Sequence, residues 1–264
     1  MNNPTVSIIM GVLNAENRMQ EAIRSIQDQT FPDWEFIICD DGSTDNTYKI
    51  LLRLAEEDSR IKPIKNEENI GLTKTLNHCL KIAKGKYIAR MDDDDFSYPN
   101  RLEAQVNFLE INKEYDFVSS AVDIYDGEKV VYKEKRKEFP QKEDFLWNSP
   151  FVHPATMFRA SKIKEVKGYR FAQETRRAED YDLFMRMYAR GMKGYNFEEA
   201  LLRYFVNSEA MRKRKYRYRI DEAIVRYKGF KRLGLFPKGV IYVIKPLIVG
   251  LFPNKLLLKI KQER

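Results

Sequence analysis

The fold is decided by residues 87–99, which have the sequence YIARMDDDDFSYP. A short apolar strand is predicted at 87–89, and it runs into four aspartates at positions 92–95. Adjacent carboxylates repel one another unless a cation or strong donors neutralise them. Alternate residues at a strand end point the same way, so Asp92 and Asp94 can meet one ion while Asp93 points elsewhere. Such oxygen ligands suit Mg²⁺ or Mn²⁺ shared with substrate phosphates.

The alternative for this acidic run is a solvated turn that caps the helix beginning near Pro99, because charge runs are usually solvated. Here the run ends an apolar strand and does not sit in a polar loop. We therefore favour the metal hypothesis.

Strand and helix patterns alternate before this stretch. We predict strands at 6–10, 36–39, 61–64 and 87–89, and helices at 15–29, 48–54 and 72–83. Strands alternating with helices of this length predict βαβ units and a largely parallel sheet, with ligands at the carboxyl ends of the strands. That edge carries Asn14, Asp40-Asp41 and the four aspartates.

After a helix at 99–112 the pattern changes. Short strands are predicted at 117–120, 122–125, 130–132 and 156–158, a helix at 180–190, and strand-like segments at 195–205. We therefore expect a body at 1–208 whose two halves, about 1–98 and 99–208, differ in their pattern of strands and helices.

Charge separates this body from the rest of the chain. Residues 209–264 hold 16 Lys and Arg against 4 Asp and Glu, whereas residues 1–208 hold 31 against 35. The apolar stretch 240–252 is interrupted by Lys245 and Pro246 and is too short to span a bilayer. A basic, apolar-rich helical extension predicts a segment lying in a membrane interface; the alternative is that 240–252 packs on protein.

Two cysteines, Cys39 and Cys79, lie in apolar patterns, which is typical of free thiols in a reducing compartment. The N-terminal apolar run is predicted to be a strand and not a signal peptide. We expect a cytoplasmic body, peripheral on the inner face of the membrane through residues 209–264.

An ordered set of motifs resembles glycosyltransferase family 2 over roughly residues 4–205. The set comprises VSIIM at 6–10, DDGSTD at 40–45, NIGL at 69–72, DDDD at 92–95, PNRL at 99–102 and EDYDL at 179–183. The resemblance implies a GT-A fold, an α/β domain with a mostly parallel, Rossmann-like sheet. It also implies transfer of a sugar from a nucleotide-sugar, with residues 1–208 as the catalytic domain, a nucleotide-sugar-binding half at about 1–98 and an acceptor-side half at 99–208.

The resemblance implies roles for the matching residues. Asp94 would be the direct metal ligand, Asp92 would lie nearer the ribose, and Asp180 would be the general base. Asp41 would accept from the N–H of a uracil ring. The remaining positions implied in donor binding are Gly11, Leu13, Asn14, Asp93, His153, Arg177 and Glu179.

Three of these positions have plain alternatives. A lone histidine such as His153 is usually a core residue, and Arg177 belongs to a polar stretch that could be a lid or a solvated loop. Leu13 stands where the family often has an aromatic residue, so the preference for a UDP-sugar rests mainly on Asp41.

The chemistry of sugar transfer supports these residue roles. A divalent ion can stabilise the leaving diphosphate, and one carboxylate can deprotonate the acceptor hydroxyl. One base with direct displacement inverts the anomeric centre. The Gln-x-x-Arg-Trp motif of processive synthases is absent from the sequence, which favours a single addition to a saccharide or lipid-linked saccharide in cell-surface polysaccharide assembly.

Other functions fit the sequence less well. The pI near 9.2 suggests a nucleic-acid binder, but the body is not basic and no nucleic acid is expected as a partner. A sugar-nucleotide pyrophosphorylase would need a Gly-rich loop after the first strand, where only Gly11 is present. A non-catalytic membrane-binding protein would not need Asp92, Asp94 and Asp180.

Overall fold

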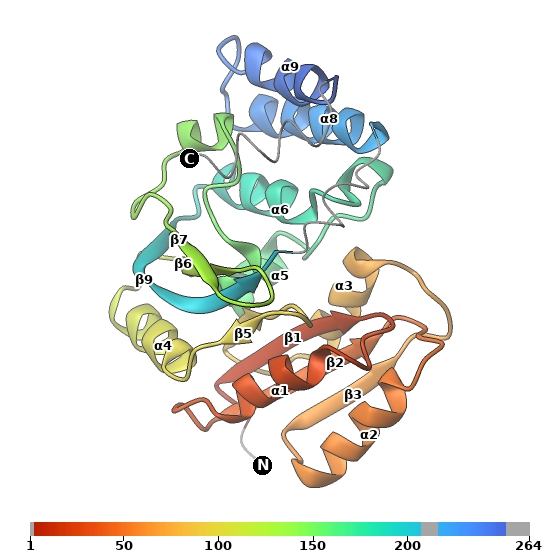
Figure 1. Cartoon of the computed structure of the whole chain (residues 1–264). Helices are drawn as coiled ribbons and strands as arrows, with labels where there is room; N and C mark the ends of the chain where they lie inside the picture. The colour runs from red at the N-terminus through yellow and green to blue at the C-terminus, as the bar shows by residue number, and fades with distance from the viewer. Residues whose placement is uncertain (1–2, 207–215, 252–264) are drawn as a thin grey trace.

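The computed structural model describes residues 3–206 and 216–251. Its first half alternates strands and helices: β1 (Val6–Val12), α1 (Met19–Gln27), β2 (Trp34–Asp40), α2 (Thr47–Glu57), β3 (Ile61–Lys65), α3 (Leu72–Ile82) and β4 (Tyr87–Arg90). The four strands are parallel, as predicted, and lie in the order β3-β2-β1-β4. The carboxyl ends of β1, β2 and β4 therefore meet at one edge (Figure 1).

The second half extends the same sheet with mixed directions. Its elements are β5 (Phe96–Ser97), α4 (Arg101–Ile111), β6 (Phe117–Tyr125), β7 (Val130–Glu134), β8 (Met157–Arg159), α5 (Ala160–Glu165), α6 (Glu179–Tyr188) and β9 (Gly194–Phe205). Three short 3₁₀ turns join them: η1 (Lys142–Leu146), η2 (His153–Ala155) and η3 (Gln173–Thr175). β8 pairs antiparallel with both β4 and β6, whereas β6 and β9 are parallel.

Alternating side chains build a core on each face of the sheet. In β1, Ile8 and Met10 join the core on one face, and Ile9 joins the core on the other. The second core also contains Phe184 of α6 and Phe230 of the C-terminal extension. One apolar face of each strand is thus covered by α1 and α4, and the other by α3, α5 and α6.

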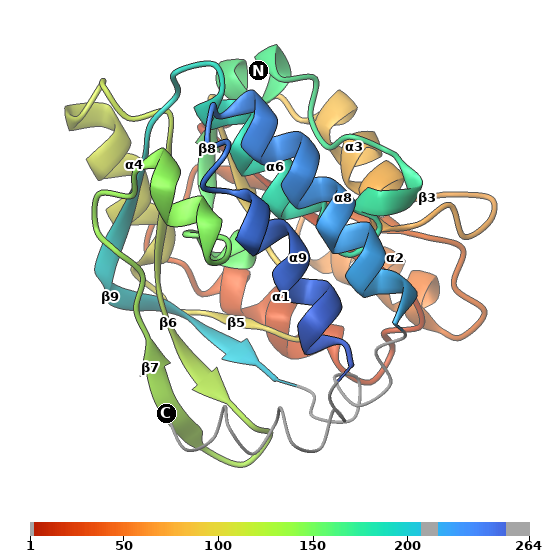
Figure 2. The ribbon, with the colours of Figure 1, turned by 90° about the horizontal axis from the view of Figure 1, so that it is seen from above.

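Two helices form the described part of the extension. α8 (Arg217–Arg232) packs on α6 and η3, and α9 (Val240–Val249) packs beside α8 (Figure 2). Within the described ranges, no helix combines the length and apolar character needed to cross a membrane. Of the basic extension predicted at 209–264, residues 209–215 and 252–264 lie outside the described residues.

The predicted element boundaries were wrong in three places. The first helix begins at Met19 and not at Ala15, because the chain turns through Asn14 (φ 47°) and the Ala15 amide donates to the Thr47 hydroxyl. The predicted strands at 117–120 and 122–125 form one strand, β6, with a register shift along β9. The helix α5 was not predicted at all.

Candidate active site

The ends of β1 and β2 are joined by short polar contacts. Asn14 Oδ1 accepts from the Thr44 amide at 2.9 Å, and the Asn14 amide donates to Ser43 Oγ at 2.9 Å. Gly11 stands against α3, because a Cβ there would lie 3.0 Å from Thr75 Cγ2. Leu13 is half-buried and Asn14 is exposed at the edge. The predicted donor-binding segment 11–14 therefore lies at the sheet edge in a fixed conformation.

Asp41 is buried and organises the loop before α3. Its Oδ1 accepts from the Ile70 amide at 3.0 Å, and its Oδ2 accepts from the Gly71 amide at 2.9 Å. Asn66 Nδ2 also donates to Oδ1 at 2.9 Å. The carboxylate implied in uracil recognition thus already holds the 69–71 loop, and its role toward a base stays a prediction.

Arg18 ties β1 to the aspartate run. Its guanidinium donates to the Leu13 and Asn14 carbonyls at 3.1 and 3.0 Å, and to Asp93 Oδ2 at 2.8 Å. Asp93 accordingly points toward Arg18. Arg18 was not among the predicted site residues.

Asp92 is held from beneath by Arg90, the last residue of β4. The Arg90 side chain is fully buried and donates from Nη2 to Asp92 Oδ1. Arg90 Nε and Nη1 have no partner within the described structure, although both are buried. The nearby Asp92 and Glu179 carboxylates offset the cost of burying this cation and keep its pKa raised.

Asp94 and Asp95 stay close to other negative charges. Desolvation within the site, followed by repulsion from Asp92 and Asp93, raises the pKa of Asp94 to about 7. Asp95 is buried, its Oδ1 accepts from the Phe205 amide at 2.9 Å, and its Oδ2 has no partner among the described residues. Burial raises the pKa of Asp95 well above its ordinary range. The run therefore carries negative charge that protein donors only partly balance.

Glu179 and Asp180 begin α6 and face the same site. Burial, and then the charge of Asp180, raises the pKa of Glu179, whose buried Oε2 is unpartnered within the described residues. Burial also raises the pKa of Asp180, and the charge of Asp92 adds to this shift. Asp180 Oδ1 accepts from the Tyr181 amide at 2.7 Å, which fixes the carboxylate at the helix start. The sheet edge and α6 thus bring the candidate base and the aspartate run together.

His153 and Arg177 are placed differently from each other. His153 is buried, Nε2 lies 2.8 Å from the Tyr169 hydroxyl, and burial lowers its pKa well below the ordinary value. This environment matches the alternative of a core histidine lying beside Arg90. Arg177 is exposed and stacks over the ring of Tyr218 in α8 at 5.5 Å. For both residues, donor binding stays a prediction.

The acidic groups fit a divalent ion that shares its ligands with a substrate. In the described part of the chain, no three His, Cys, Asp or Glu side chains are grouped to enclose a metal. Asp94 and Asp92, whose repulsion the protein balances only in part, can supply one or two oxygens, and Mg²⁺-type sites commonly complete their shell with phosphates and water. The residues present therefore fit such an ion, with part of its shell left for a diphosphate.

Sequence reasoning missed residues that shape the site from below. Arg90 and Tyr204 were not singled out, although the Tyr204 pKa is raised by burial and then by the charge of Asp92. One signal was available for Arg90, since an arginine inside an apolar strand must find a buried partner. Tyr204 comes from β9, about 110 residues later, and no local pattern connects it to the run.

A mixed α/β sheet of this form, with aspartates after the fourth strand and an acidic helix start opposite, defines a GT-A glycosyltransferase. The chain belongs to glycosyl transferase family 2, since the model of that family matches residues 7–167. The predictions of family, of fold and of a glycosyltransferase are confirmed.

Relatives of known sequence carry related names. The chain is 41% identical to "Putative glycosyltransferase EpsE" of Bacillus subtilis (strain 168), over 99% of this chain and 94% of that protein. It is 37% identical to "UDP-Glc:alpha-D-GlcNAc-diphosphoundecaprenol beta-1,3-glucosyltransferase WfgD" of Escherichia coli, over 50% of this chain and 51% of that protein.

Solved structures share the fold at low sequence identity. S. aureus TarS 1-349 in complex with UDP-GlcNAc aligns with a TM-score of 0.66 at 20% identity, covering 94% of this chain and 79% of that one. The mannosyltransferase PcManGT from Pyrobaculum calidifontis, in complex with GDP-Man and Mn²⁺, aligns with a TM-score of 0.62 at 18% identity, covering 98% and 80%. These likenesses establish the GT-A fold.

Proposed function

We propose that this glycosyltransferase moves a single sugar from a UDP-sugar to a hydroxyl of a saccharide or lipid-linked saccharide, with inversion, in cell-surface polysaccharide assembly. The observation that carries this proposal is the placement of Asp180 at the start of α6, within electrostatic reach of Asp92. Asp180 is thus available for the acceptor, and the separate pair Asp92 and Asp94 is available for the leaving diphosphate.

In the proposed reaction, Asp180 takes the proton of the acceptor hydroxyl as that oxygen attacks the anomeric carbon. The bond from the anomeric carbon to the diphosphate oxygen breaks, and the diphosphate leaves with the electron pair. The raised pKa of Asp180 suits this role, because a general base works best when its pKa approaches the working pH. A single displacement of this kind inverts the anomeric centre.

The cofactor in this proposal is Mn²⁺ or Mg²⁺, held by Asp94 with help from Asp92. When bound, the ion would neutralise charge on the leaving diphosphate. Arg90 fixes Asp92 through one oxygen, so the other Asp92 oxygen is free for the ion or the donor ribose. The solved structure with GDP-Man and Mn²⁺ supports a metal in this fold.

The UDP preference is supported by the fold relative solved with UDP-GlcNAc and by the name of the Escherichia coli relative. That name also supports a lipid diphosphate-linked acceptor. We propose that residues 1–98 bind the donor, that residues 99–208 face the acceptor, and that residues 209–264 hold the enzyme peripherally on the cytoplasmic face of the membrane.

Exposed apolar side chains on α8 and α9 support this membrane contact. On α9, Ile241, Ile244 and Ile248 recur at the spacing of one helix face and are 76%, 44% and 53% exposed. On α8, Ile220 and Ile224 are also exposed. Because residues 209–264 carry 16 basic against 4 acidic groups, an anionic bilayer is the partner that such a surface fits.

The decisive experiment measures donor binding and nucleotide release with UDP-, GDP- and dTDP-sugars, in Mn²⁺, Mg²⁺ or EDTA. We expect slow hydrolysis of one UDP-sugar by the wild type, lost in EDTA and in Asp94→Ala. Asp180→Asn should bind that donor with unchanged affinity and release no nucleotide. Asp28→Ala and Asp28→Asn, which change an exposed aspartate beyond α1, serve as matched controls.

Equal, metal-independent binding of every nucleotide, unchanged by Asp94→Ala, would rule out the proposed site. Normal turnover by Asp180→Asn would remove Asp180 as the base while leaving the donor assignment intact.

A further inference from the structure

Asp180 is reached through a stretch of chain with little regular structure of its own. Residues 169–182, which we call the base segment, lead from the end of α5 through the three-residue turn η3 to the first turn of α6. So short a turn depends on tertiary packing for its position. The placement of Asp180 therefore depends on what packs against the base segment.

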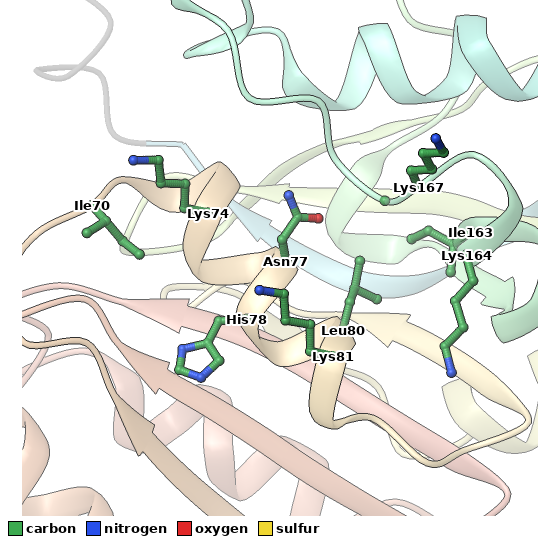
Figure 3. Close-up of a pocket in the computed structure, with 10 residues that line it drawn as sticks. Ile70, Lys74, Asn77, His78, Leu80, Lys81, Ile163, Lys164 and Lys167 are labelled. Carbon is green, nitrogen blue, oxygen red and sulfur yellow. The ribbon is translucent and has the colours of Figure 1, made fainter.

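The start of the base segment is attached to α3. Asn77 of α3 donates to the Tyr169 carbonyl at 2.7 Å and accepts from the Tyr169 amide at 2.9 Å. Lys74, also on α3, lies over the ring of Phe171 at 4.2 Å. Figure 3 shows Asn77 and Lys74 on α3, beside the cavity between this helix and the end of α5. The first residues of the base segment are thus fixed to the catalytic body.

The rest of the base segment is covered by α8 of the extension. Helix α8 lies alongside α6 and packs on η3 (Figure 2). Lys228 Nζ donates to Glu174 Oε1 at 2.7 Å. The Arg177 guanidinium lies over the ring of Tyr218 at 5.5 Å. Two residues of α8 therefore hold the middle of the base segment from outside the catalytic body.

Helix α8 also reaches the start of α6. The Arg226 guanidinium lies over the ring of Tyr181, the residue after Asp180, at 5.2 Å. Burial raises the pKa of Asp180, and the charge of Glu222 on α8 adds to this shift after that of Asp92. The candidate base thus lies within electrostatic reach of the extension.

Glu174 connects the α8 contact to α6. Its side chain is 12% exposed, and its Oε1 accepts from Lys228 and also from Arg170 Nη1 at 2.9 Å. The hydrogen bond from Lys228 is the largest cause that lowers the pKa of Glu174 to about 2. Arg170 Nε donates in turn to Asp182 Oδ1 at 3.0 Å, and Asp182 is buried in the first turn of α6. A continuous path of charged hydrogen bonds therefore runs from α8 to the turn that carries Asp180.

We propose that α8 takes part in catalysis, with Lys228 as a positioning residue that acts through Glu174 on the placement of Asp180. This inference rests on the proposed role of Asp180 as the general base, and it gives the extension a task besides membrane contact. An ion pair with an exposed partner, such as this one, contributes little to stability. A small displacement of a catalytic group, by contrast, slows the chemical step strongly. Lys228 should therefore matter more for turnover than for unfolding.

The first test reverses the charge of Lys228 and measures turnover separately from donor binding. The assay is hydrolysis of the UDP-sugar that the wild type uses, with the full chain and without vesicles. We expect Lys228→Glu to lower kcat by about three- to tenfold, because Glu174 then faces a like charge, and to leave the donor Kd within about twofold. Lys228→Arg keeps the charge and the donor, so it should retain the wild-type kcat.

Lys113→Glu is the matched control for this charge reversal. Lys113 Nζ donates to Glu110 Oε2 at 2.8 Å in an exposed ion pair just beyond α4. The control should leave kcat unchanged. Equal losses of kcat in Lys228→Glu and Lys113→Glu would overturn the proposal, and so would a loss of donor affinity in Lys228→Glu that accounts for its lower activity.

A double-mutant cycle tests whether Lys228 acts through Glu174. Glu174→Gln alone should lower kcat, because Lys228 and Arg170 both lose their shared carboxylate. In that background Lys228→Glu should cause little further loss, since the charge that it opposes is gone. Losses that multiply in the double variant would show that Lys228 acts by another route and would overturn the proposal.

Amide hydrogen exchange over residues 169–182, measured without ligand, reports the order of the base segment independently of turnover. We expect faster exchange in Lys228→Glu than in the wild type and in Lys113→Glu. Faster exchange with an unchanged kcat would make the contact purely structural and overturn the proposal. Failure of the proposed function has a different result, because Asp180→Asn would then release nucleotide normally whatever Lys228→Glu does.

Discussion

At the scale of single residues, a buried arginine supports the whole aspartate run. Arg90 lies under Asp92, and its charge also acts on Glu179, His153 and Asp95. Its two unpartnered donors show that the protein leaves part of this guanidinium unsatisfied. Arg90 therefore offsets the repulsion among the site carboxylates from the protein interior, without contacting a substrate.

Replacing Arg90 with methionine should lower the free energy of unfolding by about 3 kcal/mol, because removal of one partner leaves the buried negative charges without their cation. Urea unfolding measures this loss. Arg53→Met is the control, since Arg53 makes an exposed pair with Glu57 at 3.9 Å and should cost less than about 1 kcal/mol. Similar losses in both variants would show that Arg90 has no special electrostatic role.

Residue identity could be predicted from sequence only where the pattern was local. The aspartates at 92–95 could be singled out because charge interrupts an apolar pattern, whereas the role of Asp180 was implied only by the resemblance to a family. Arg18 was missed because its ion-pair partner, Asp93, becomes a neighbour only when β1 and β4 pair. His153 shows the opposite case. Its position in the chain suggested a role in donor binding, whereas the structure buries its side chain in the core.

At the scale of elements, the exposed face of α9 is the feature that core packing does not explain. Ile241→Asp/Ile248→Asp should reduce binding to vesicles containing phosphatidylglycerol by at least about tenfold, because two side chains no longer enter the apolar layer. Sedimentation with anionic and zwitterionic vesicles measures this. Ile111→Asp, at a 79% exposed position of α4, should bind as the wild type does. Unchanged binding by the α9 variant would remove α9 from the membrane contact.

One arginine fastens α8 to the catalytic body. Arg226 is buried and donates to the Leu146 carbonyl at 3.0 Å and to the Trp147 carbonyl at 3.2 Å. Arg226→Met would leave the Leu146 carbonyl unpaired, while Lys245 Nζ would still donate to the Trp147 carbonyl at 3.0 Å. We expect a loss of about 2 kcal/mol and faster proteolytic cleavage next to α8. Lys238→Met, at an exposed position, is the control. Unchanged cleavage would show that apolar packing alone holds the helix.

Helix and strand identity was predictable, whereas several boundaries were not. The periodicity of 72–83 matches α3 within a residue. The start of α1 depends instead on Asn14 and Thr47, which are far apart in sequence. The α5 segment is only six residues long, too short to show a helical period.

At the scale of the whole molecule, the sheet joins two parts of different predictability. The parallel direction of β1 to β4 follows from repeated βαβ units, whose connections are local. The position of β8 between β4 and β6 does not, because β8 pairs with strands that lie far from it in the sequence. This long-range pairing places Tyr204 and α6 opposite the aspartates, so the acceptor side of the site could not be predicted in detail.

The same assembly makes the stability of the molecule depend on pH. Burial and the charge of Asp180 raise the pKa of Glu179, so the folded state holds its proton more tightly than the unfolded chain does. The stability that this gives is present at low pH and is lost as pH rises through the raised pKa. Burial lowers the pKa of His153, so the stability linked to its neutral form is lost as pH falls below the ordinary histidine pKa. Because this trend opposes that of Glu179, a variant must isolate the Glu179 contribution.

Between about pH 5 and pH 8, the unfolding free energy of the wild type should therefore fall relative to that of Glu179→Gln, by of the order of 1 kcal/mol per pH unit at most. Urea unfolding at several pH values, without metal or donor, measures the difference. Glu57→Gln, at an exposed carboxyl on α2, should stay parallel to the wild type. If the unfolding free energy of Glu179→Gln also stays parallel to that of the wild type, Glu179 is already ionised across this range. The charge of the site carboxylates would then be balanced by neighbouring charged groups and not by bound protons.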